Sequence, residues 1–534
     1  MCGIWLLLTQ RSISNVEKFL DTLKTRGPEG YHHIILDGKG YIGFTRLAIN
    51  GLNPRGMQPM EYKGTYSVTN GEIYNWNHLM VKYSLTCSSG SDCEIVGTLY
   101  REEFTGKSFE VLADLFSSFD GVFATAIVDE VYDYTIIARD PFGVRPLYIG
   151  FSDDSLSLGS EIKSLPADAC RVEPFPPGTY RVYRTSTREL LYSATYHKRT
   201  EEPICMAEEE AMQLIRTALD AAVEKRMMTE RPVAALLSGG LDSSLIAALV
   251  SQKLKRLGLP PLKTFSIGMP ESSDLKHARL VAEWIGSNHT EVVLSPDDFF
   301  ETIPEVIRVT ETYDTTTIRA STGNWSIGKA ITRTNAKVVF NGDGSDEVWG
   351  SYKYFFNAPS AQEYGAEVNR LLDDIHYFDV LRSDRSISSH GLEPRTPFLD
   401  KGFVNAVLSI PLEMRLPIRG QRIEKYLLRK AFDDGITLPP AVLWRKKEAF
   451  SDGISGPDRA WYEDIRERVG PQVPENWQEV AASKYEQNPP KTPEMFYYRL
   501  IYEKIYGNSS PNVPYFWMPK WSNTDDPSAR TICD

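Results

Sequence analysis

Residues 233–250 have the sequence VAALLSGGLDSSLIAALV, in which three features follow one another directly. Val233 to Leu237 form an apolar run of strand length, which suits a central parallel strand covered on both faces. The glycines that follow allow a tight turn, and an apolar helical period begins after them. A glycine turn that ends at a helix N-terminus directs free N–H groups at an anion. The stretch therefore predicts an α/β fold with a phosphate-binding loop at a strand end.

This loop differs from the GxxxxGK[ST] loop of nucleoside triphosphatases, because no lysine follows the glycines and the spacing is shorter. The letters SGG alone are as often an ordinary glycine turn. The full SGGLDSS after an apolar strand resembles the pyrophosphate loop of the ATP pyrophosphatases, which cleave ATP between its α and β phosphates and adenylate an oxygen of their substrate. Ligands of such sheets bind at the carboxyl ends of the strands.

The length of 534 residues predicts two or three domains. The 59 basic and 71 acidic residues give a net charge of −12, which disfavours nucleic-acid and membrane partners and favours small-molecule substrates. The six cysteines lack the spacing of a disulfide framework or a zinc site, so we expect a reducing, cytoplasmic location. Ile4 to Leu8 are too short for a signal sequence, and no apolar stretch approaches membrane-span length.

The second residue is a candidate nucleophile. Removal of Met1 leaves Cys2 with a thiol and a free α-amine on one residue. An α-amine, with a pKa of about 7.7 to 8.0, can take the proton of its own thiol without a histidine partner. A single early cysteine is more often inert, so the assignment of Cys2 as a nucleophile depends on the sequence that follows it.

The first 150 residues contain short β-like runs separated by turns, which predict a sandwich of antiparallel sheets. The expected strands are Tyr31–Leu36, Gly40–Phe44, Tyr66–Thr69, Gly121–Val128 and Thr135–Ala138. The loops resemble those of class II glutamine amidotransferases, with RGPE at 26–29, RLA at 46–48, NGEIYN at 70–75, GSDC at 90–93, RD at 139–140 and GVRP at 143–146. The resemblance implies an Ntn-type αββα sandwich over residues 2–200. The polar composition near residues 196–203 separately predicts a linker there.

The same resemblance implies that Cys2 attacks the glutamine amide, while Asn70 and the Gly71 N–H stabilise the oxyanion. An arginine fork suits the glutamine carboxylate, and a carboxylate suits its amine. Taken singly, Arg46 could equally form a surface ion pair, and Asn-Gly is a common turn. The residues implied to bind glutamine are Arg46, Leu47, Asn70, Gly71, Glu72 and Asp92.

Beyond residue 208, helical and strand patterns alternate, which predicts a doubly wound parallel sheet. The expected elements are a helix from Glu208 to about Met227, a strand at Lys263–Ile267, a helix at Asp274–Ile285 closed by Gly286, and a strand at Lys337–Phe340. The last strand leads into NGDGSDE at 341–347. Carboxylates and glycines at a strand end are typical of a metal or nucleotide loop, although a solvated acidic turn is the alternative.

Nearly the whole chain resembles the glutamine-hydrolysing asparagine synthetases. Further matches are HGLE at 390–393, RTPFLD at 395–400, WRKKEAFSDG at 444–453 and WMPKW at 517–521, and the last motifs resemble the eukaryotic branch. The resemblance implies a synthetase domain of the ATP pyrophosphatase type over residues 208–534. It implies that ammonia from glutamine passes internally to a β-aspartyl-adenylate, giving asparagine, AMP and pyrophosphate, with ATP as substrate and Mg²⁺ as cofactor. The sequence leaves open whether the protein forms a homodimer.

Roles in the synthetase domain follow from the resemblance, residue by residue. Asp242 and Asp346 correspond to the Mg²⁺ ligands, and Lys447 to the cation that neutralises phosphate charge, although a snorkelling surface lysine is the alternative. Thr316 and Arg319 correspond to the aspartate-binding pair. The residues implied to bind ATP are Leu236, Ser238, Gly239, Gly240, Asp242, Ser243, Ser244, Ile267, Asn341 and Gly342.

Three positions depart from the family pattern. Asp343 stands where a catalytic glutamate is usual, the loop after RLA reads Ile49-Asn50-Gly51 where an aspartate commonly closes the motif, and Thr396 stands where a valine is usual. One rival interpretation is a related synthetase that acts on another acid, such as a β-lactam-forming enzyme, but those usually lack the nucleophilic Cys2. The other is a catalytically weak homologue that senses an amino acid or scaffolds a partner, and only Asp343 favours it.

Overall fold

The computed structural model describes residues 1–199, 202–456, 459–507 and 512–531. Residues 200 and 201 of the predicted linker, and Cys533, lie outside the described residues. The chain divides into two compact units, which are described separately. Unit 1 comprises Met1–Arg199 together with two later segments, Met228–Arg231 and Ser388–Glu393, and unit 2 comprises the rest.

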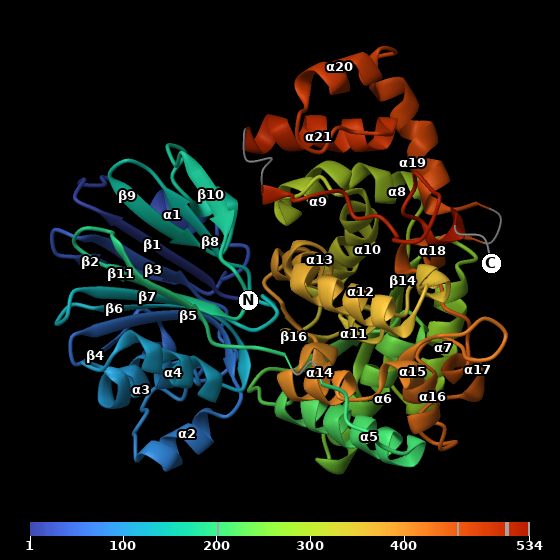
Figure 1. The fold of residues 1–534 in the computed structure, drawn as a ribbon, viewed down its shortest axis with the longest axis horizontal. Coiled ribbons are helices and arrows are strands. Elements are labelled where there is room, and N and C mark those ends of the chain that lie inside the picture. The colour runs from blue at the N-terminus through green and yellow to red at the C-terminus, as the bar shows by residue number, and fades with distance from the viewer. Residues whose placement is uncertain (200–201, 457–458, 508–511, 532–534) are drawn as a thin grey trace. The chain divides into compact units, whose positions relative to one another are not determined.

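The first sheet of unit 1 has six antiparallel strands in the order β10-β8-β9-β1-β3-β2 (Figure 1). The strands are β1 (Gly3–Thr9), β2 (Tyr31–Leu36), β3 (Gly40–Thr45), β8 (Tyr148–Phe151), β9 (Ser155–Gly159) and β10 (Arg171–Pro174). Period-2 alternation assigns the two faces of β1. Leu6 and Leu8 enter the core shared with Val68, whereas Trp5 and Leu7 pack with the helix that covers the outer face.

The second sheet of unit 1 is also six-stranded and antiparallel, in the order β12-β11-β7-β6-β5-β4. Its strands are β4 (Met60–Tyr62), β5 (Thr65–Ile73), β6 (Gly121–Asp129), β7 (Tyr134–Arg139), β11 (Thr179–Arg184) and β12 (Leu190–Thr195). α1 (Glu17–Asp21) lies on the first sheet, and α2 (Trp76–Tyr83), α3 (Glu94–Leu99) and α4 (Leu112–Ser118) lie on the side of the second. The predicted αββα sandwich and its five strands are therefore confirmed.

Unit 2 is built on a five-stranded sheet in the order β15-β14-β13-β16-β17. The strands are β13 (Val233–Leu236), β14 (Lys263–Gly268), β15 (Asn288–Val293), β16 (Val338–Phe340) and β17 (Glu393–Arg395). β13 pairs in parallel with β14 and β16, and β14 pairs in parallel with β15, as the alternating pattern predicted. β15 was not predicted, because its sequence NHTEVV lies at a largely solvent-accessible sheet edge and lacks an apolar run.

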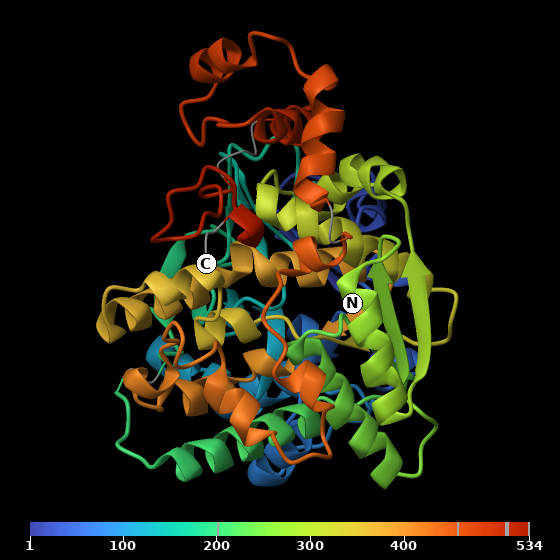
Figure 2. The same cartoon turned by 90° about the vertical axis from the view of Figure 1, so that its right-hand side faces the viewer.

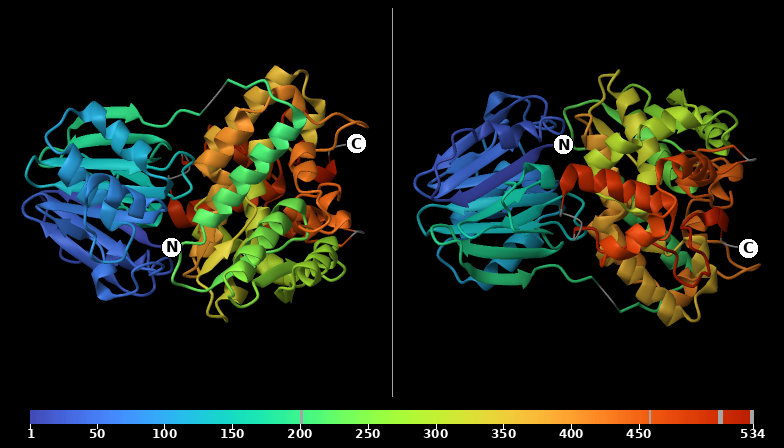
Figure 3. Two further views of the ribbon diagram at one scale, coloured as in Figure 1. Left: turned by 90° about the horizontal axis from the view of Figure 1, so that it is seen from below. Right: turned by 90° about the horizontal axis from the view of Figure 1, so that it is seen from above.

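Helices flank this sheet, and they include the predicted helix that ends at Gly286 in a left-handed cap (Figures 1 and 2). α5 lies at one end of unit 2, and α20 and α21 lie at the opposite end (Figures 1 and 3). Within the described residues, none of the helices combines the length and apolar character needed to cross a bilayer. The helices are α5 (Glu208–Lys225), α6 (Leu241–Arg256), α7 (Ser273–Ile285), α8 (Pro296–Glu301), α9 (Ile303–Thr310), α10 (Thr315–Ile331), α11 (Ser345–Trp349), α12 (Ala361–Asp374), α13 (Asp379–Ser388), α14 (Lys401–Leu408), α15 (Leu412–Arg415), α16 (Tyr426–Ala431), α17 (Pro440–Leu443), α18 (Phe450–Gly453), α19 (Trp461–Val469), α20 (Trp477–Lys484) and α21 (Pro493–Tyr506).

Candidate functional site

Cys2 lies directly before β1, and its Sγ is 3.4 Å from both the N–H and the carbonyl oxygen of Leu47. Burial raises the pKa of the Cys2 thiol, and the α-ammonium of the chain lowers it. The α-ammonium of Met1 donates to the carbonyl oxygen of Leu392 at 3.0 Å. The first residues of the chain are therefore held against the RLA loop that was predicted to bind glutamine.

Asn70 and Gly71 lie next to each other on β5, at its pairing with β6. The Asn70 side chain is fully buried, and neither its amide nitrogen nor its amide oxygen has a hydrogen-bond partner within the described residues. An unpaired buried amide costs about 1 to 3 kcal/mol, which is typical of a group kept ready for a ligand. Gly71 has φ +147°, and a Cβ there would lie 2.0 Å from the Val122 carbonyl oxygen, so no larger residue fits.

The two predicted carboxylates of the glutamine site share one amide donor. Asn50 Nδ2 donates to Glu72 Oε2 at 2.8 Å and to Asp92 Oδ1 at 3.2 Å. Asp92 Oδ2 also accepts from the Ile73 N–H at 2.7 Å. Burial raises the pKa of Asp92 to about 6. The Asn50 amide therefore bridges the two carboxylates and offsets part of their mutual repulsion.

Arg46 is oriented by backbone carbonyls. Its Nη2 donates to Gly51 O at 2.5 Å and its Nη1 to Asn53 O at 2.9 Å. A Cβ at Gly56 would lie 2.2 Å from Arg46 Nη2, so the glycine makes room for the guanidinium. Burial lowers the pKa of Arg46, and the negative charge on Cys2 raises it.

A late segment of the chain also belongs to this site. Glu393 is a buried carboxylate of the 388–393 segment in unit 1. After burial, which is the largest cause, its charge contributes to raising the pKa of Cys2 and of Asp92. The HGLE match pointed to this segment but carried no role, because nothing in the local sequence connects it to the N-terminus.

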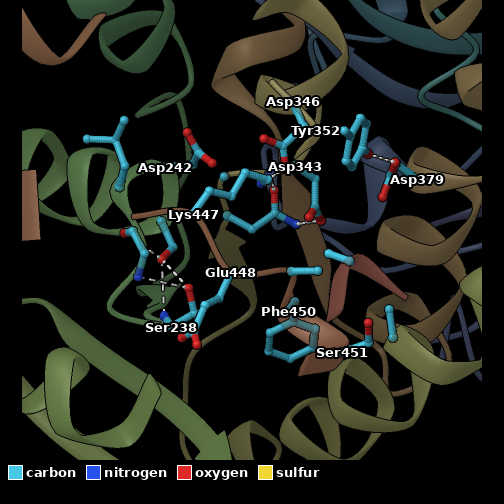
Figure 4. A pocket seen from close by; sticks show the side chains of 18 of the residues that line it. Ser238, Asp242, Asp343, Asp346, Tyr352, Asp379, Lys447, Glu448, Phe450 and Ser451 are labelled. Carbon is cyan, nitrogen blue, oxygen red and sulfur yellow. Dashed lines mark hydrogen bonds and ion pairs between the residues drawn. The ribbon is translucent and has the colours of Figure 1, made fainter. Parts of the chain in front are cut away.

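The candidate nucleotide site is a cavity in unit 2 at the carboxyl ends of β13, β14 and β16 (Figure 4). The Ser238 N–H donates to Ser243 Oγ at 3.0 Å, and the Gly240 N–H donates to Ser238 Oγ at 3.3 Å. Gly239 has φ +73°, and a Cβ there would lie 2.4 Å from the Ala278 nitrogen of α7. The loop is therefore folded tightly at the N-terminus of α6, as predicted for a phosphate cradle.

Most of the residues predicted to bind ATP line this cavity, including the loop residues Ser238, Gly240 and Ser243. Two of them, Gly239 and Ser244, are not among its lining residues. The Ser244 side chain is fully buried, without a hydrogen-bond partner within the described ranges. The remaining predicted residues that line it are Leu236, Asp242, Ile267, Asn341 and Gly342.

The two predicted metal ligands converge on one ammonium group. Lys425 Nζ lies 2.6 Å from Asp242 Oδ2 and 2.6 Å from Asp346 Oδ1. Lys447 Nζ lies 2.5 Å from Asp346 Oδ2, and Ser345 donates to Asp242 Oδ1 at 2.8 Å. Burial raises the pKa of Asp346, but the ammoniums of Lys425 and Lys447 outweigh it and lower the pKa.

This pair of carboxylates fits Mg²⁺ bound together with nucleotide phosphates, because Mg²⁺ commonly uses one or two carboxylates plus phosphate oxygens. Among the residues that the structure describes, no group of three or more His, Cys, Asp or Glu side chains forms a closed metal site. Lys425 is buried, with a left-handed φ of +56°, a conformation that a non-glycine residue adopts only where its surroundings enforce it.

Asp343 follows β16 and lines the same cavity. Its carboxylate accepts from Asn341 Nδ2 at 2.8 Å and from Arg382 Nη2 at 3.2 Å. Burial raises the pKa of Asp343, and the Arg382 guanidinium partly offsets this. The side chain is thus a buried carboxylate with positively polarised partners, held within the predicted nucleotide loop.

A further acidic cluster on the cavity wall was not predicted. The Tyr352 hydroxyl lies 3.0 Å from Asp379 Oδ2 (Figure 4). It is also in hydrogen-bond contact with Glu347. Burial and then the Asp379 charge raise the pKa of Glu347 well above its usual value. Arg382 pairs with both Asp379 and Asp343, so it links this cluster to Asp343.

The two residues predicted to bind aspartate differ in their surroundings. Thr316 lines the cavity, and its buried Oγ1 has no hydrogen-bond partner in the described part of the chain. Arg319 is not a lining residue. Its guanidinium is 3% exposed and forms paired hydrogen bonds of 2.6 to 2.8 Å with both Glu494 and Asp526. Glu494 of α21 and Asp526 of the C-terminal segment therefore occupy the guanidinium of this predicted aspartate ligand.

Comparisons with known proteins agree with this division of the chain. Residues 1–197 match the family described as "Glutamine amidotransferase domain", and residues 214–372 and 357–510 match the family described as "Asparagine synthase". A solved structure described as glutamine phosphoribosylpyrophosphate amidotransferase from B. subtilis is 15% identical, over 55% of this chain and 91% of that chain, with a TM-score of 0.34. By its family matches, the chain combines a glutamine amidotransferase domain with an asparagine synthase domain.

Curated relatives extend the match over the full length. "Asparagine synthetase [glutamine-hydrolyzing]" of Gallus gallus is 40% identical over 563 residues, which is 100% of this chain and 98% of the relative. The protein of the same name from Cricetulus griseus is 40% identical over 564 residues, with the same coverage. The chain belongs to the family of glutamine-hydrolysing asparagine synthetases.

Proposed function

We propose that this chain synthesises asparagine from aspartate, ATP and glutamine. The observation that carries the proposal is 40% identity to named asparagine synthetases over the whole chain, in a molecule that keeps both Cys2 and the SGGLDSS loop. Retention of the cysteine argues against a synthetase of the β-lactam-forming kind. The convergence of Lys425 and Lys447 on Asp242 and Asp346 argues against a scaffold, which has no need of a charged cavity.

In unit 1, the α-amine of Cys2, freed by removal of Met1, takes the thiol proton, and the thiolate attacks the side-chain carbonyl of glutamine. The unpaired Asn70 amide and the Gly71 N–H donate to the oxyanion that develops there. The C–N bond breaks to release ammonia, and water hydrolyses the thioester to glutamate. Arg46 and Asp92 hold the substrate's carboxylate and amine.

In unit 2, the loop of Ser238, Gly240 and Ser243 would hold the pyrophosphate portion of ATP. Asp242 and Asp346 would hold Mg²⁺, which supplies positive charge against the phosphates when it is bound. Lys447 and Lys425 have the ammoniums closest to these carboxylates, so they would neutralise the leaving pyrophosphate. The side-chain carboxylate of aspartate attacks the α-phosphorus, and pyrophosphate leaves.

Ammonia, passed on internally from unit 1, then attacks the adenylate carbonyl, and AMP departs. Asp343 would accept the proton that the nitrogen loses, since its raised pKa suits a proton acceptor in the cavity. Thr316 would contact the aspartate substrate. Arg319 would support the site indirectly, through Glu494 and Asp526. We also propose a cytoplasmic location, which suits free cysteines such as Cys2.

Product analysis tests the proposal. The protein is incubated with ATP, Mg²⁺, glutamine and a panel of amino acids, and the amidated product is identified by mass spectrometry. We expect asparagine, AMP and pyrophosphate in equal amounts, with aspartate alone as the acceptor. If ammonium salts and aspartate yield no pyrophosphate from ATP while both ligands still bind, the sensor interpretation replaces this one.

A further inference from the structure

Part of the unit 2 cavity wall is formed by apolar side chains with a carboxamide among them. The apolar lining residues come from β13, β14, α10 and the start of α18, namely Leu236, Phe265, Ile267, Ala320, Ile327 and Phe450. Asn324 of α10 lies among them on the cavity wall. The phosphate loop begins two residues after Leu236, so this apolar part adjoins the phosphate end of the cavity.

Asn324 is placed by the helical period. Thr316, Ala320, Asn324 and Ile327 follow one another at intervals of four, four and three residues, which puts them on one face of α10, and all four line the cavity. The neighbouring Gly323 brings that face against the opposite wall. A Cβ at Gly323 would lie 2.9 Å from the Phe450 ring and 3.8 Å from Ile267 Cγ2.

The Asn324 side chain is polar, buried and unpaired. The residue is 4% exposed, and its Nδ2 has no hydrogen-bond partner within the described residues. A buried amide donor without an acceptor is costly, so a ligand that supplies an acceptor is favoured there. The surrounding apolar side chains suit the faces of a flat aromatic ring.

We propose that the Asn324 carboxamide hydrogen-bonds the adenine of ATP and selects adenine nucleotides for this enzyme. A carboxamide offers a donor and an acceptor side by side. Adenine offers the complement through its 6-amino group, which donates, and its N7, which accepts. Guanine offers two acceptors at the same edge, its O6 and N7, and matches the carboxamide less well. The inference rests on the proposed function, because it assigns one more contact to the same ATP site.

The test measures nucleotide selectivity in the full-length enzyme. Pyrophosphate release that depends on aspartate and ammonium is followed with ATP, with purine riboside triphosphate, which lacks the 6-amino group, and with 2′-deoxy-ATP. The wild-type kcat/KM should favour ATP over purine riboside triphosphate by roughly 10- to 100-fold, the discrimination of one paired base contact. In Asn324→Leu, which is close in size, this ratio should fall to about one, chiefly through a raised KM for ATP.

Ser326→Ala is the matched control. Ser326 lies two residues along the same helix, and its buried Oγ is also unpaired within the described residues, but it does not line the cavity. The selectivity of this variant should equal that of the wild type. A similar loss of selectivity in Ser326→Ala would overturn the inference, because the effect would then come from helix packing.

Other outcomes also decide the question. An unchanged ratio in Asn324→Leu, or a change confined to 2′-deoxy-ATP, overturns the inference while the proposed function stands. If Asn324→Leu does not fold, as judged by circular dichroism, Asn324→Ala takes its place. Equal kcat/KM values of the wild type for ATP and purine riboside triphosphate overturn the inference without the need for any variant. Absence of aspartate-dependent pyrophosphate release in the wild type instead refutes the proposed function.

Discussion

Replacing Lys425 by methionine removes the ammonium that lies 2.6 Å from both Asp242 and Asp346. Breaking a buried ion pair from one side destabilises a protein by about 3 to 5 kcal/mol. Lys447 still neutralises Asp346 from 2.5 Å, so Asp242 carries most of the uncompensated charge and we expect about 3 kcal/mol. Mg²⁺ should restore most of the lost stability, since a ligand at a hundred times its Kd adds about 2.7 kcal/mol to the free energy of unfolding.

The assay is urea unfolding of wild-type and Lys425→Met protein, in EDTA and in excess Mg²⁺ without nucleotide. The wild type should respond little to Mg²⁺, because two ammoniums already balance the two carboxylates. Lys430→Met is the control, since Lys430 lies on α16, the helix that follows Lys425, and is 40% exposed where it pairs with Glu208, so its loss should cost less than about 1 kcal/mol. Equal stability of Lys425→Met and wild type in EDTA, or equal responses to Mg²⁺, would refute the reasoning.

The remaining predictions concern the reacting groups. Cys2→Ala should abolish glutamine-dependent synthesis and leave ammonium-dependent synthesis intact, and glutamine use by that variant would exclude Cys2 as the nucleophile. Asp343→Asn should lose asparagine formation by about a hundredfold or more while keeping most of the aspartate-dependent adenylation, measured as asparagine against pyrophosphate, and a wild-type rate would mean that another group such as Glu347 takes the proton. Below about pH 6 the kcat/KM for glutamine should fall by a further factor of about ten per pH unit, beyond the loss that protonation of the Cys2 α-amine causes, because Asp92, whose pKa is about 6, loses there the charge that holds the substrate's ammonium. Asp92→Asn should be less active and should lack this limb of the pH profile.

Local sequence could predict those helices, strands and loops whose pattern is complete within one short stretch of the chain. The strand, loop and helix at 233–250 were predicted because apolar periods, glycines and a helix start follow one another along the chain. The same holds for β2, whose predicted bounds of Tyr31 and Leu36 are those observed. The edge strand β15 escaped prediction because its side chains have no buried face to impose an apolar pattern.

Tertiary structure alone decided which charges meet. Lys425 reaches Asp242 across 183 residues, and Arg319 reaches Asp526 across 207, so no local pattern records either pair. The first contact places a second ammonium beside the predicted metal ligands, and the second pairs the predicted aspartate ligand Arg319 with a buried carboxylate. The sequence by itself determined the family, the two kinds of unit and the chemical groups available to each. The free energy of a buried charge depends on which partner the folded chain places beside it, and that placement belongs to the tertiary structure.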